Sequence, residues 1–443
     1  MRAVVGRLTA ANAIVAALGL LTGPLLARAL GPGGRGDLAA ILVPLGLLPA
    51  LLGLGIPAYL YRELPRGRPP AVVLTSLAVP VTAVGAVMAV LAVPASRWLA
   101  GDRETVRLFL LMGFLLMPLS LVGRLLLPAL ASLERWERVV AATIIPFAVS
   151  AATIVVLFAA GRLTVAAAAA ASIAGGLLAL APGLPLLWEG GRPRFERRVA
   201  RDGVAFGAQS WLGGIAFLVN VRLDQFVMIG AVAPRELGLY AVAATLASAS
   251  GIVTSGISPP LMTRVGAGET ALVAQTVRLT LAATAIFNAL LALFASLLLP
   301  LVFGADFRRA VGMTLVLLLA NVFAAGCAVL SSGLQACGHP LVPSLGEGAA
   351  VVTTLVGLLL LLGPLGGVGA AIASTVAYAT SFAIQLAAAR RLVPGGGRYV
   401  VPTRRDLSVA AGQMQRKRTS SLRAVNKSVS TRQPGANNSS AVR

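Results

Sequence analysis

The amino-acid sequence predicts an all-α, polytopic membrane protein with twelve transmembrane helices arranged as two six-helix lobes. Of its 443 residues, 57% are hydrophobic and only 12% are charged, and the mean hydropathy is +0.87. Soluble domains carry about a quarter charged residues, so this composition excludes a fold that faces water on all sides. Because a transmembrane helix needs about 20 apolar residues, a dozen such helices would account for most of the hydrophobic content.

Apolar runs between charged or Gly/Pro-rich breaks define the predicted spans. Most are longer than a hydrocarbon core of about 30 Å requires, and several contain proline or glycine, so we expect tilted and kinked helices. The first run is too long for the apolar part of a signal peptide, so we expect it to remain as a span. In chain order, the spans cover residues 8–30, 37–61, 70–94, 106–133, 139–160, 164–188, 203–232, 237–262, 278–303, 310–336, 341–363 and 366–390.

The chain has 37 Lys and Arg residues against 15 Asp and Glu, which gives a formal net charge of +22. In a soluble protein this excess would suggest nucleic-acid binding, but in a membrane protein it first reports the orientation of the loops. Fourteen basic residues fall between spans on the side of the N terminus and 12 in the C-terminal tail, whereas nine fall on the other side. The positive-inside rule therefore predicts that both termini are cytoplasmic.

The predicted organisation is an N-terminal lobe over residues 1–190, a basic cytoplasmic linker over 191–202, a C-terminal lobe over 203–392 and a disordered basic tail over 393–443. The tail either holds anionic lipid headgroups or is simply solvated. Nucleic-acid binding is the less favoured interpretation, because no aromatic residue beyond Tyr399 interleaves its charges.

An internal repeat supports the two-lobe organisation. Residues 32–39 match residues 234–241 at an offset of 202 positions, and a weaker match joins residues 130–132 to 334–336. Six spans separate the copies, so both copies have the same orientation, which predicts parallel lobes related by an axis along the membrane normal. The alternative is that Pro-x-x-x-Gly turns recur between helices by chance.

Composition also limits the chemistry of the protein. One histidine, His339, and two cysteines, Cys327 and Cys337, exclude a metal cluster and a disulfide framework. The sequence contains no evident nucleophile–base pair or glycine-rich phosphate loop, and its loops are too short for a catalytic domain outside the membrane. We therefore expect a protein that is not an enzyme and that has no metal or cofactor.

Four ionisable residues fall inside predicted spans, and because charge is costly in a bilayer they are functional candidates. The guanidinium groups of Arg124 and Arg222 match the oxygens of an anionic substrate. The carboxylates of Asp224 and Glu347 are candidates for ion coupling. The structural alternative is that Arg124 reaches the lipid headgroups and that Asp224 links neighbouring helices.

Asn220, Gln209 and Asn12 are candidates for polar residues of a water-filled cavity between the lobes. The alternative is that these amides join helices, which is their commoner role in membranes. Because Arg222 and Asp224 are two residues apart, they lie about 200° apart around a regular helix and are not expected to pair directly.

Three segments resemble the polysaccharide flippases, which belong to the multidrug, oligosaccharidyl-lipid and polysaccharide exporter (MOP) superfamily. The most specific segment is the run Leu-Gly-Leu-Tyr-Ala-Val-Ala at 237–243, which follows Arg-Leu-Asp-Gln at 222–225. The others are Leu-Ala-Arg-Ala-Leu-Gly-Pro at 26–32 with Gly36, and Gly-Gly-Val-Gly-Ala-Ala at 366–371. The resemblance covers residues 1–392.

The resemblance implies a V-shaped pair of six-helix lobes around a central cationic cavity. It implies a substrate, an undecaprenyl-diphosphate-linked oligosaccharide, that is flipped to the outer leaflet of a bacterial cell membrane for cell-surface polysaccharide or lipopolysaccharide biosynthesis. Arg222 and Asp224 correspond to polar positions of the family's seventh span, and Arg28 corresponds to the end of its first span, as a third substrate-binding cation. Span two lacks a clear intramembrane cation. Glycosyltransferases or a polymerase are the expected protein partners.

Two other functions remain open. A multidrug cation antiporter of the same superfamily would need acidic groups facing a cavity, whereas the intramembrane cations Arg124 and Arg222 favour an anionic substrate. A non-transporting scaffold for glycan assembly would recruit glycosyltransferases through its basic tail, and removal of residues 394–443 would then abolish its function.

Overall fold

The computed structural model describes residues 2–53, 56–251, 257, 261–262, 264–265, 268–393 and 399. The side chains of residues 2–6, 9, 57–58, 62, 208–221 and 250 lie outside this description. All regular secondary structure in the described ranges is helical, as predicted. The α-helices are α1 (Arg2–Leu52), α2 (Pro57–Glu63), α3 (Pro70–Val90), α4 (Ala92–Ala100), α5 (Glu104–Leu115), α6 (Met117–Ser132), α7 (Trp136–Ala159), α8 (Val165–Leu178), α9 (Arg197–Ala231), α10 (Pro234–Ala247), α13 (Ala271–Leu298), α14 (Val311–Ala336) and α15 (Leu341–Leu392).

Shorter helical segments extend or connect these elements. They are the 3-10 helices η1 (Leu64–Arg66), η2 (Ala181–Leu187), η3 (Ser248–Ser250) and η5 (Ala305–Ala310), and the π-helix η4 (Leu299–Phe303).

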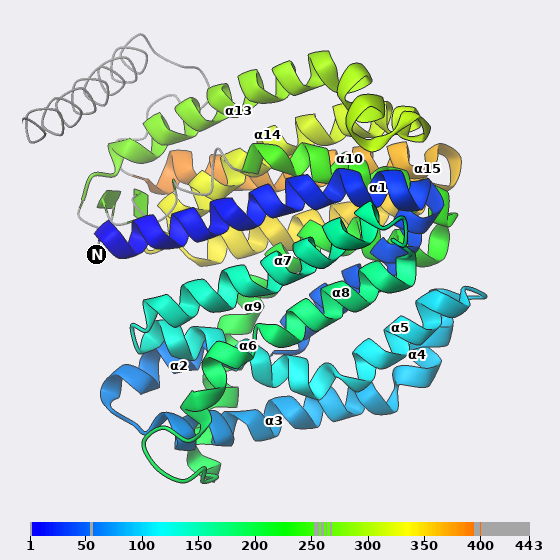
Figure 1. The fold of residues 1–443 in the computed structure, drawn as a ribbon. Coiled ribbons are helices and arrows are strands. Elements are labelled where there is room, and N and C mark those ends of the chain that lie inside the picture. The colour runs from blue at the N-terminus through cyan, green and yellow to red at the C-terminus, as the bar shows by residue number, and fades with distance from the viewer. Residues whose placement is uncertain are drawn as a thin grey trace, which may run out of the picture.

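The predicted spans overlap these helices, except that the second half of the span at 237–262 lies largely outside the described residues. Two pairs of spans are continuous. α1 and α15 each contain two helices joined at a glycine, Gly31 and Gly366, where φ is 63° and 55° (Figure 1). Glycine adopts such positive φ values without steric cost, so the chain can reverse without a loop. By length and hydropathy, seven described helices could cross a membrane, or eight if the bent pair α5 and α6 forms one span. In that number, α1 and α15 count as one helix each, although each contains two predicted spans.

The fourth predicted span is bent, as the expectation of kinked helices requires. The helix axis bends by 58° between α5 and α6, at Leu116. Pro118, at the start of α6, lacks the N–H that would continue the helix across the bend. Gly85 of α3 packs against this point, and a Cβ there would lie 2.6 Å from the Cα of Pro118. The missing side chain therefore lets α3 approach the bend closely.

The connections gather at two ends of the bundle. At one end, Arg7 lies 3.8 Å from Glu137 at the start of α7, and Arg135 pairs with Glu189 ahead of α9. We call this the basic end; it comprises residues 7, 63–70, 133–137 and 189–202. The opposite end comprises residues 28–37, 100–104, 159–164, 229–236, 299–304 and 366–367.

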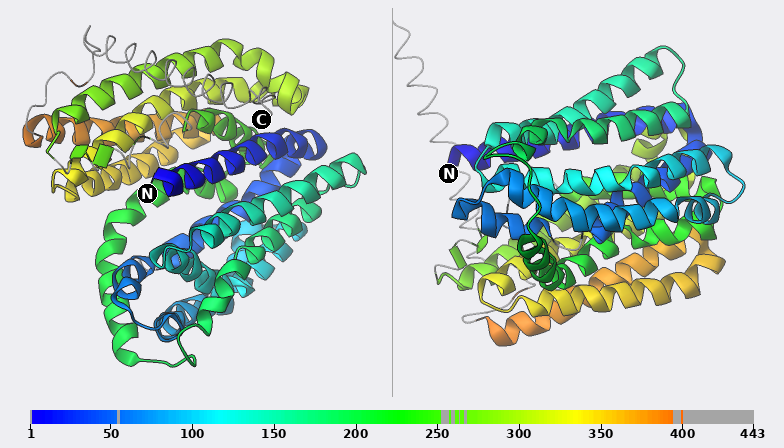
Figure 2. Two further views of the ribbon diagram at one scale, coloured as in Figure 1. Left: turned by 60° about the vertical axis from the view of Figure 1, so that its left-hand side comes forward. Right: turned by 90° about the horizontal axis from the view of Figure 1, so that it is seen from below.

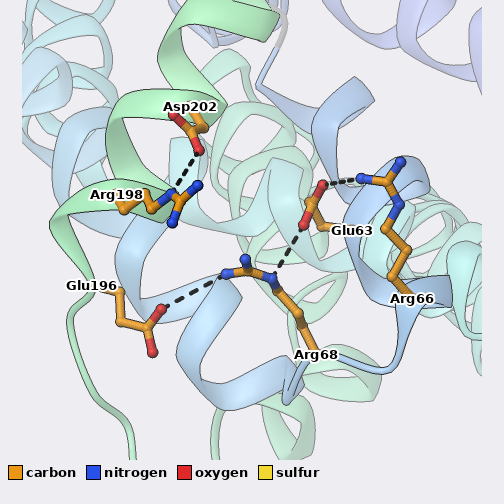
Figure 3. Close-up of polar contacts among 6 residues, drawn as sticks. All are labelled: Glu63, Arg66, Arg68, Glu196, Arg198 and Asp202. Carbon is orange, nitrogen blue, oxygen red and sulfur yellow. Dashed lines mark hydrogen bonds and ion pairs between the residues drawn. The ribbon is translucent and has the colours of Figure 1, made fainter.

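The segment that connects the two halves is fastened to the basic end. Arg68 lies between two carboxylates, 3.2 Å from Glu63 and 3.7 Å from Glu196 (Figure 3). The pair with Glu196 is exposed on both sides and contributes about 0–1 kcal/mol, so it positions the segment more than it stabilises the fold. α9 begins at Arg197, within the linker predicted over 191–202.

Figure 2 shows the helices as two groups, α3–α8 on one side and α10 with α13–α15 on the other. α1 runs along the seam between them and packs against α7 of the first group and α10 of the second. One hydrophobic core extends through both groups, and a second, smaller core lies within the C-terminal group. The seam is therefore a packed interface as well as the place where the halves could separate.

The two copies of the sequence repeat contact one another at the seam. A Cβ on Gly36 would lie 1.7 Å from the carbonyl oxygen of Pro234, and a Cβ on Gly238 would lie 1.8 Å from the carbonyl oxygen of Pro32. These four residues are equivalent in pairs within the repeat. The glycine of each copy contacts the proline carbonyl oxygen of the other copy, and such a reciprocal contact is typical of two parts related by a two-fold axis. It is what an axis between two parallel halves would produce.

The described part of the chain beyond α15 packs against the bundle. Val393 and Tyr399 belong to the smaller core, and the hydroxyl of Tyr399 donates a hydrogen bond to the carbonyl oxygen of Ala389 at 3.2 Å. The sequence assigns both residues to a disordered tail, but their apolar surfaces are buried. The remainder of the predicted tail, residues 394–398 and 400–443, lies outside the described residues.

Candidate substrate cavity

Three adjoining cavities lie within the bundle, and Leu42 of α1 lines all of them. The central cavity, of about 560 Å³, is lined by α1, α9, α10, α14 and α15, so both halves contribute to it. The N-terminal cavity, of about 540 Å³, is lined by α1 and α5–α8. The seam cavity, of about 760 Å³, lies among α1, α6–α8, α10 and η3.

Arg35 lies where the central and seam cavities meet and lines both. It occupies the first turn of the second half of α1, on the same face as Ala39 and Val43, which also line the central cavity. The Nε atom of Arg35 is buried and has no hydrogen-bond partner among the described residues. A buried donor without a partner costs about 1–3 kcal/mol, more when it is charged. Such a donor is typical of a site that is completed by a ligand or by water.

Arg222 and Asp224 of α9 both line the central cavity but have different partners. The Nη1 atom of Arg222 donates to Oε1 of Gln225 at 3.2 Å. The carboxylate of Asp224 is buried and accepts hydrogen bonds from the hydroxyl of Tyr240 and, at 3.1 Å, from that of Ser374. Asp224 therefore joins α9 to α10 and α15, while Arg222 keeps donors available to the cavity.

Arg124 of α6 lines the N-terminal cavity. The rest of that lining is mostly Leu, Ala, Gly and Pro, with hydroxyl groups from Ser120 and Ser172. Sequence reasoning left open whether Arg124 reaches a cavity or the lipid headgroups; in the structure it lines the N-terminal cavity and is exposed. The bend at Leu116 sets the direction of the helix that carries it.

Arg28, expected to bind substrate with Arg222, lines none of the three cavities. It lies at the opposite end, where its Nε donates to the carbonyl oxygen of Val302 at 3.0 Å and its Nη2 donates to that of Leu301. The reason is geometric: Arg28 is in the last turn before the reversal at Gly31, so it reaches η4 rather than the interior. Arg28 thus connects the N-terminal half to the C-terminal half.

The remaining candidates are dispersed. Asn12 is exposed and lines none of the three cavities. Gln209 and Asn220 lie on α9, but their side chains are outside the described ones. Glu347 is buried near the start of α15, away from the cavities, and its Oε1 accepts a hydrogen bond from Ser381 at 3.0 Å.

Sequence reasoning missed Arg35 by placing it in a loop on the outer side and starting span two at Asp37. The structure starts the second half of α1 at Pro32, directly after the turn at Gly31. Proline is favoured in the first turn of a helix, so the Gly-Pro pair is a start signal that could have extended the span. With that extension, span two begins with a cation that lines the central and seam cavities.

The two halves are joined at the opposite end. Besides the contacts of Arg28 and of Gly36 with Gly238, the Nη2 atom of Arg103 donates to the carbonyl oxygen of Ile229 at 3.2 Å, and its Nη1 lies 3.4 Å from Asp37. These contacts hold the two halves together at that end. Among the described residues, no group of three or more His, Cys, Asp or Glu side chains is placed to hold a metal ion.

The fold is shared with solved membrane transporters. The structure superposes on "Lipid II flippase MurJ, inward closed conformation" with a TM-score of 0.73 at 13% identity, over 86% of this chain and 86% of that chain. A MATE family multidrug resistance transporter of the MOP superfamily in its inward-facing conformation gives a TM-score of 0.65 at 15% identity, over 85% and 94% of the two chains. An outward-facing conformation gives 0.53 at 16% identity, over 88% and 96%.

The fold and its apolar helices define a multi-pass membrane protein with the architecture of the MOP transporters. A family model described as "Polysaccharide biosynthesis protein" matches residues 3–265, more than half of the chain, and the chain belongs to that family. The predicted family is therefore confirmed. None of the curated proteins matches the chain.

Proposed function

We propose that the protein is a flippase that moves an undecaprenyl-diphosphate-linked oligosaccharide from the cytoplasmic to the outer leaflet of a bacterial cell membrane, for the assembly of a cell-surface polysaccharide. The observation that carries the proposal is the set of three guanidinium groups, Arg35, Arg222 and Arg124, along adjoining cavities. Guanidinium stays charged at all relevant pH values and binds phosphate oxygens through paired hydrogen bonds. Membership of the polysaccharide biosynthesis family supports this class of substrate.

The distribution of polar groups suits an amphipathic substrate. The central cavity carries the charges of Arg35, Arg222 and Asp224, whereas the N-terminal and seam cavities are lined mainly by aliphatic side chains. A diphosphate would bind to the charged wall while the beginning of a lipid chain lies against the aliphatic wall. Arg124 would contact the headgroup from the aliphatic side.

In this proposal the basic end is cytoplasmic, because arginine is enriched in cytoplasmic loops. The closed contacts at the opposite end, and the higher TM-score with the inward-facing than with the outward-facing transporter, support an inward-facing state. The lipid-linked sugar would then enter from the cytoplasmic leaflet. Alternating access would require the contacts at the opposite end to break, with glycosyltransferases supplying substrate and a polymerase consuming it.

The fold alone also allows a multidrug cation antiporter. Among the described residues that line the three cavities, one carboxylate, Asp224, stands against three guanidinium groups. Its Oδ2 accepts hydrogen bonds from Tyr240 and Ser374, and its Oδ1 accepts one from the backbone N–H of Gln225. A net positive cavity repels an organic cation and attracts an anion. The charge balance therefore favours the flippase.

The proposal can be tested with the full chain in vesicles of phosphatidylethanolamine and phosphatidylglycerol. The probe is undecaprenyl diphosphate carrying one fluorescent N-acetylglucosamine, and the fraction quenched by external dithionite reports its leaflet. We expect rapid exchange with the wild type and at least a tenfold slower rate for the double variant Arg35→Gln, Arg222→Gln. Arg162→Gln, an exposed residue after α7, is the matched control.

Exchange no faster than in protein-free vesicles would contradict the proposal. Uptake of a cationic dye by the same vesicles, with no exchange of the lipid probe, would favour the antiporter instead. In cells, deletion of the protein should leave the lipid-linked sugar on the cytoplasmic face. Unchanged surface glycan without a trapped intermediate would also count against a flippase.

A further inference from the structure

A further cavity, of about 430 Å³, lies at the basic end and shares no lining residue with the three cavities of the bundle. It lies between the start of α1 and the turn that joins α6 to α7, and α1 and α7 pack side by side (Figure 1). Its volume is within the range of roughly 300–1,000 Å³ that is common for ligand sites. The lining residues are Arg7, Glu134, Arg135, Trp136, Glu137 and Arg138.

Arg138 supplies an unsatisfied donor to this cavity. Its Nη1 atom is buried and has no hydrogen-bond partner among the described residues. The other two arginines already face carboxylates: Arg135 pairs with Glu189. Arg7 lies 3.8 Å from Glu137, which is beyond hydrogen-bond distance. A buried charged donor without a partner is costly, and a guanidinium matches phosphate oxygens, so a phosphate would complete Arg138.

Glu134 brings a negative charge to the same cavity from an unusual backbone conformation. Its φ is 56°, and it is the one residue other than glycine with a positive φ in the described part of the chain. Strain of this kind is concentrated at functional sites. The residue is exposed, and its carboxylate forms no ion pair with any described side chain. The turn therefore presents a carboxylate that is free to accept a cation.

The cavity lies at the end of a membrane-spanning helix. α7 is long and apolar enough to cross a membrane, and its first residue is Trp136, which lines the cavity. Tryptophan is enriched at the membrane–water interface, at the level of the lipid headgroups. Basic pockets between helices at this level bind lipid headgroups in other membrane proteins. The phosphate compound at highest concentration beside this cavity is therefore a membrane lipid.

We propose that this cavity binds the phosphoethanolamine headgroup of a membrane lipid, with the phosphate on Arg138 and the ammonium on Glu134. The charges of the lining favour a zwitterion over an anion, because two carboxylates line the cavity and Glu189 neutralises Arg135. An ammonium group offers three donors to such carboxylates. The inference is independent of the proposed transport function.

Trp136 can serve as a local reporter of the bound lipid. In the full chain, Trp98, Trp188 and Trp211 are replaced by phenylalanine. The protein in detergent is titrated with phosphatidylethanolamine or phosphatidylglycerol whose acyl chains carry bromine, which quenches indole fluorescence on contact. We expect half-maximal quenching by phosphatidylethanolamine at a concentration at least fivefold lower than by phosphatidylglycerol. Arg138→Gln removes the phosphate partner and should raise that concentration at least tenfold.

A second variant separates recognition of the ammonium from effects on folding. Asparagine tolerates a positive φ, so Glu134→Asn keeps the turn and removes the charge. We expect this variant to bind phosphatidylethanolamine no better than phosphatidylglycerol, with an unchanged midpoint of thermal unfolding before lipid is added. Arg192→Gln is the matched control, because Arg192 is an exposed arginine of the basic end outside the cavity, and it should change neither titration.

Equal quenching of the wild type by the two lipids would overturn the proposal, and so would quenching that Arg138→Gln leaves unchanged. A preference for phosphatidylglycerol would also overturn it and would make the cavity a site for anionic lipids. Displacement of the brominated lipid by undecaprenyl diphosphate at a lower concentration than by unlabelled phosphatidylethanolamine would assign the cavity to that diphosphate instead. None of these results bears on probe exchange, so the proposed flippase function is judged separately.

Discussion

Arg28 and Arg35 lie seven residues apart, on either side of the turn at Gly31, and have opposite roles in the structure. Arg28 donates hydrogen bonds to carbonyl oxygens of η4, and Arg35 lines two cavities. Sequence spacing gives the depth of a residue along a helix, but the direction of its side chain depends on where the helix turns and what packs beside it. That dependence explains why hydropathy could assign Arg222, Asp224 and Arg124 to spans, whereas the directions of the Arg28 and Arg35 side chains could not be read from the sequence.

Arg35 should be sensitive to conservative substitution. Arg35→Lys keeps the charge but loses the fork of donors that binds two phosphate oxygens, and Arg35→Gln loses both. With charge-assisted hydrogen bonds contributing about 1.5–3 kcal/mol, we expect about a tenfold loss of probe affinity for lysine and a larger loss for glutamine. Titration of the reconstituted protein with the fluorescent lipid measures this. Equal affinity of the wild type and Arg35→Gln would remove Arg35 from the site.

Arg28 should behave differently. Arg28→Ala removes the hydrogen bonds to Leu301 and Val302 but no cavity group, so the midpoint of thermal unfolding should fall while probe affinity stays within a factor of about two. Thermal unfolding in detergent, followed by affinity measurement at low temperature, separates the two effects. A large loss of affinity with an unchanged midpoint would restore Arg28 to the binding site.

At the scale of elements, hydropathy predicted the all-helical fold and the approximate positions of its apolar helices, because these are bounded by charge, glycine or proline. The sequence also predicted where the chain reverses inside α1 and α15, since the predicted breaks between spans fall at or beside Gly31 and Gly366. The start of α9 within the predicted linker was not predicted, because arginine is both a good helix former and a typical loop residue. A contact between two helices, such as that of α1 with α10, is indicated in the sequence only by the small residues at the point of contact.

That approach can be tested through its glycines. Gly36→Ala places a methyl group 1.7 Å from the carbonyl oxygen of Pro234, so the starts of the second half of α1 and of α10 must move apart. We expect a lower midpoint of thermal unfolding and easier opening of the opposite end. Gly33→Ala, three residues earlier, meets nothing within 4 Å and should leave the midpoint unchanged or slightly higher.

Opening can be measured by the accessibility of single cysteines at the contact to a water-soluble maleimide. Gly238→Ala should reproduce the effect of Gly36→Ala, because the contact is reciprocal. An unchanged midpoint and unchanged labelling in both variants would mean that the two helices do not approach this closely in the membrane.

For the whole molecule, orientation follows from the charge distribution and has a direct test. With Cys327 and Cys337 replaced by alanine, Arg162→Cys at the opposite end should react with an impermeant maleimide in intact cells. Arg192→Cys at the basic end should react only after permeabilisation. Both positions are exposed, so burial does not limit either reaction. The reverse pattern would place the basic end outside and contradict the positive-inside prediction.

The C-terminal segment separates a flippase from a scaffold. Removal of residues 400–443 keeps the packed Tyr399 and should leave probe exchange and thermal stability intact. Removal of residues 394–443 also deletes Tyr399, and loss of a buried aromatic ring costs about 3–5 kcal/mol, so the unfolding midpoint should fall. Loss of surface glycan after the shorter deletion, with probe exchange preserved, would favour a recruiting function for the tail.

The reciprocal contact of Gly36 with Gly238 also bears on the origin of the chain. A motif that packs against its own copy can do so whether the copies lie on one chain or on two, because the geometry is that of a symmetric dimer. A single six-helix ancestor that formed such a dimer would have needed only gene fusion to become this protein. Once fused, the two copies were free to diverge, which is how one half could acquire the buried acids Asp224 and Glu347 while the other kept Arg124 in an aliphatic wall.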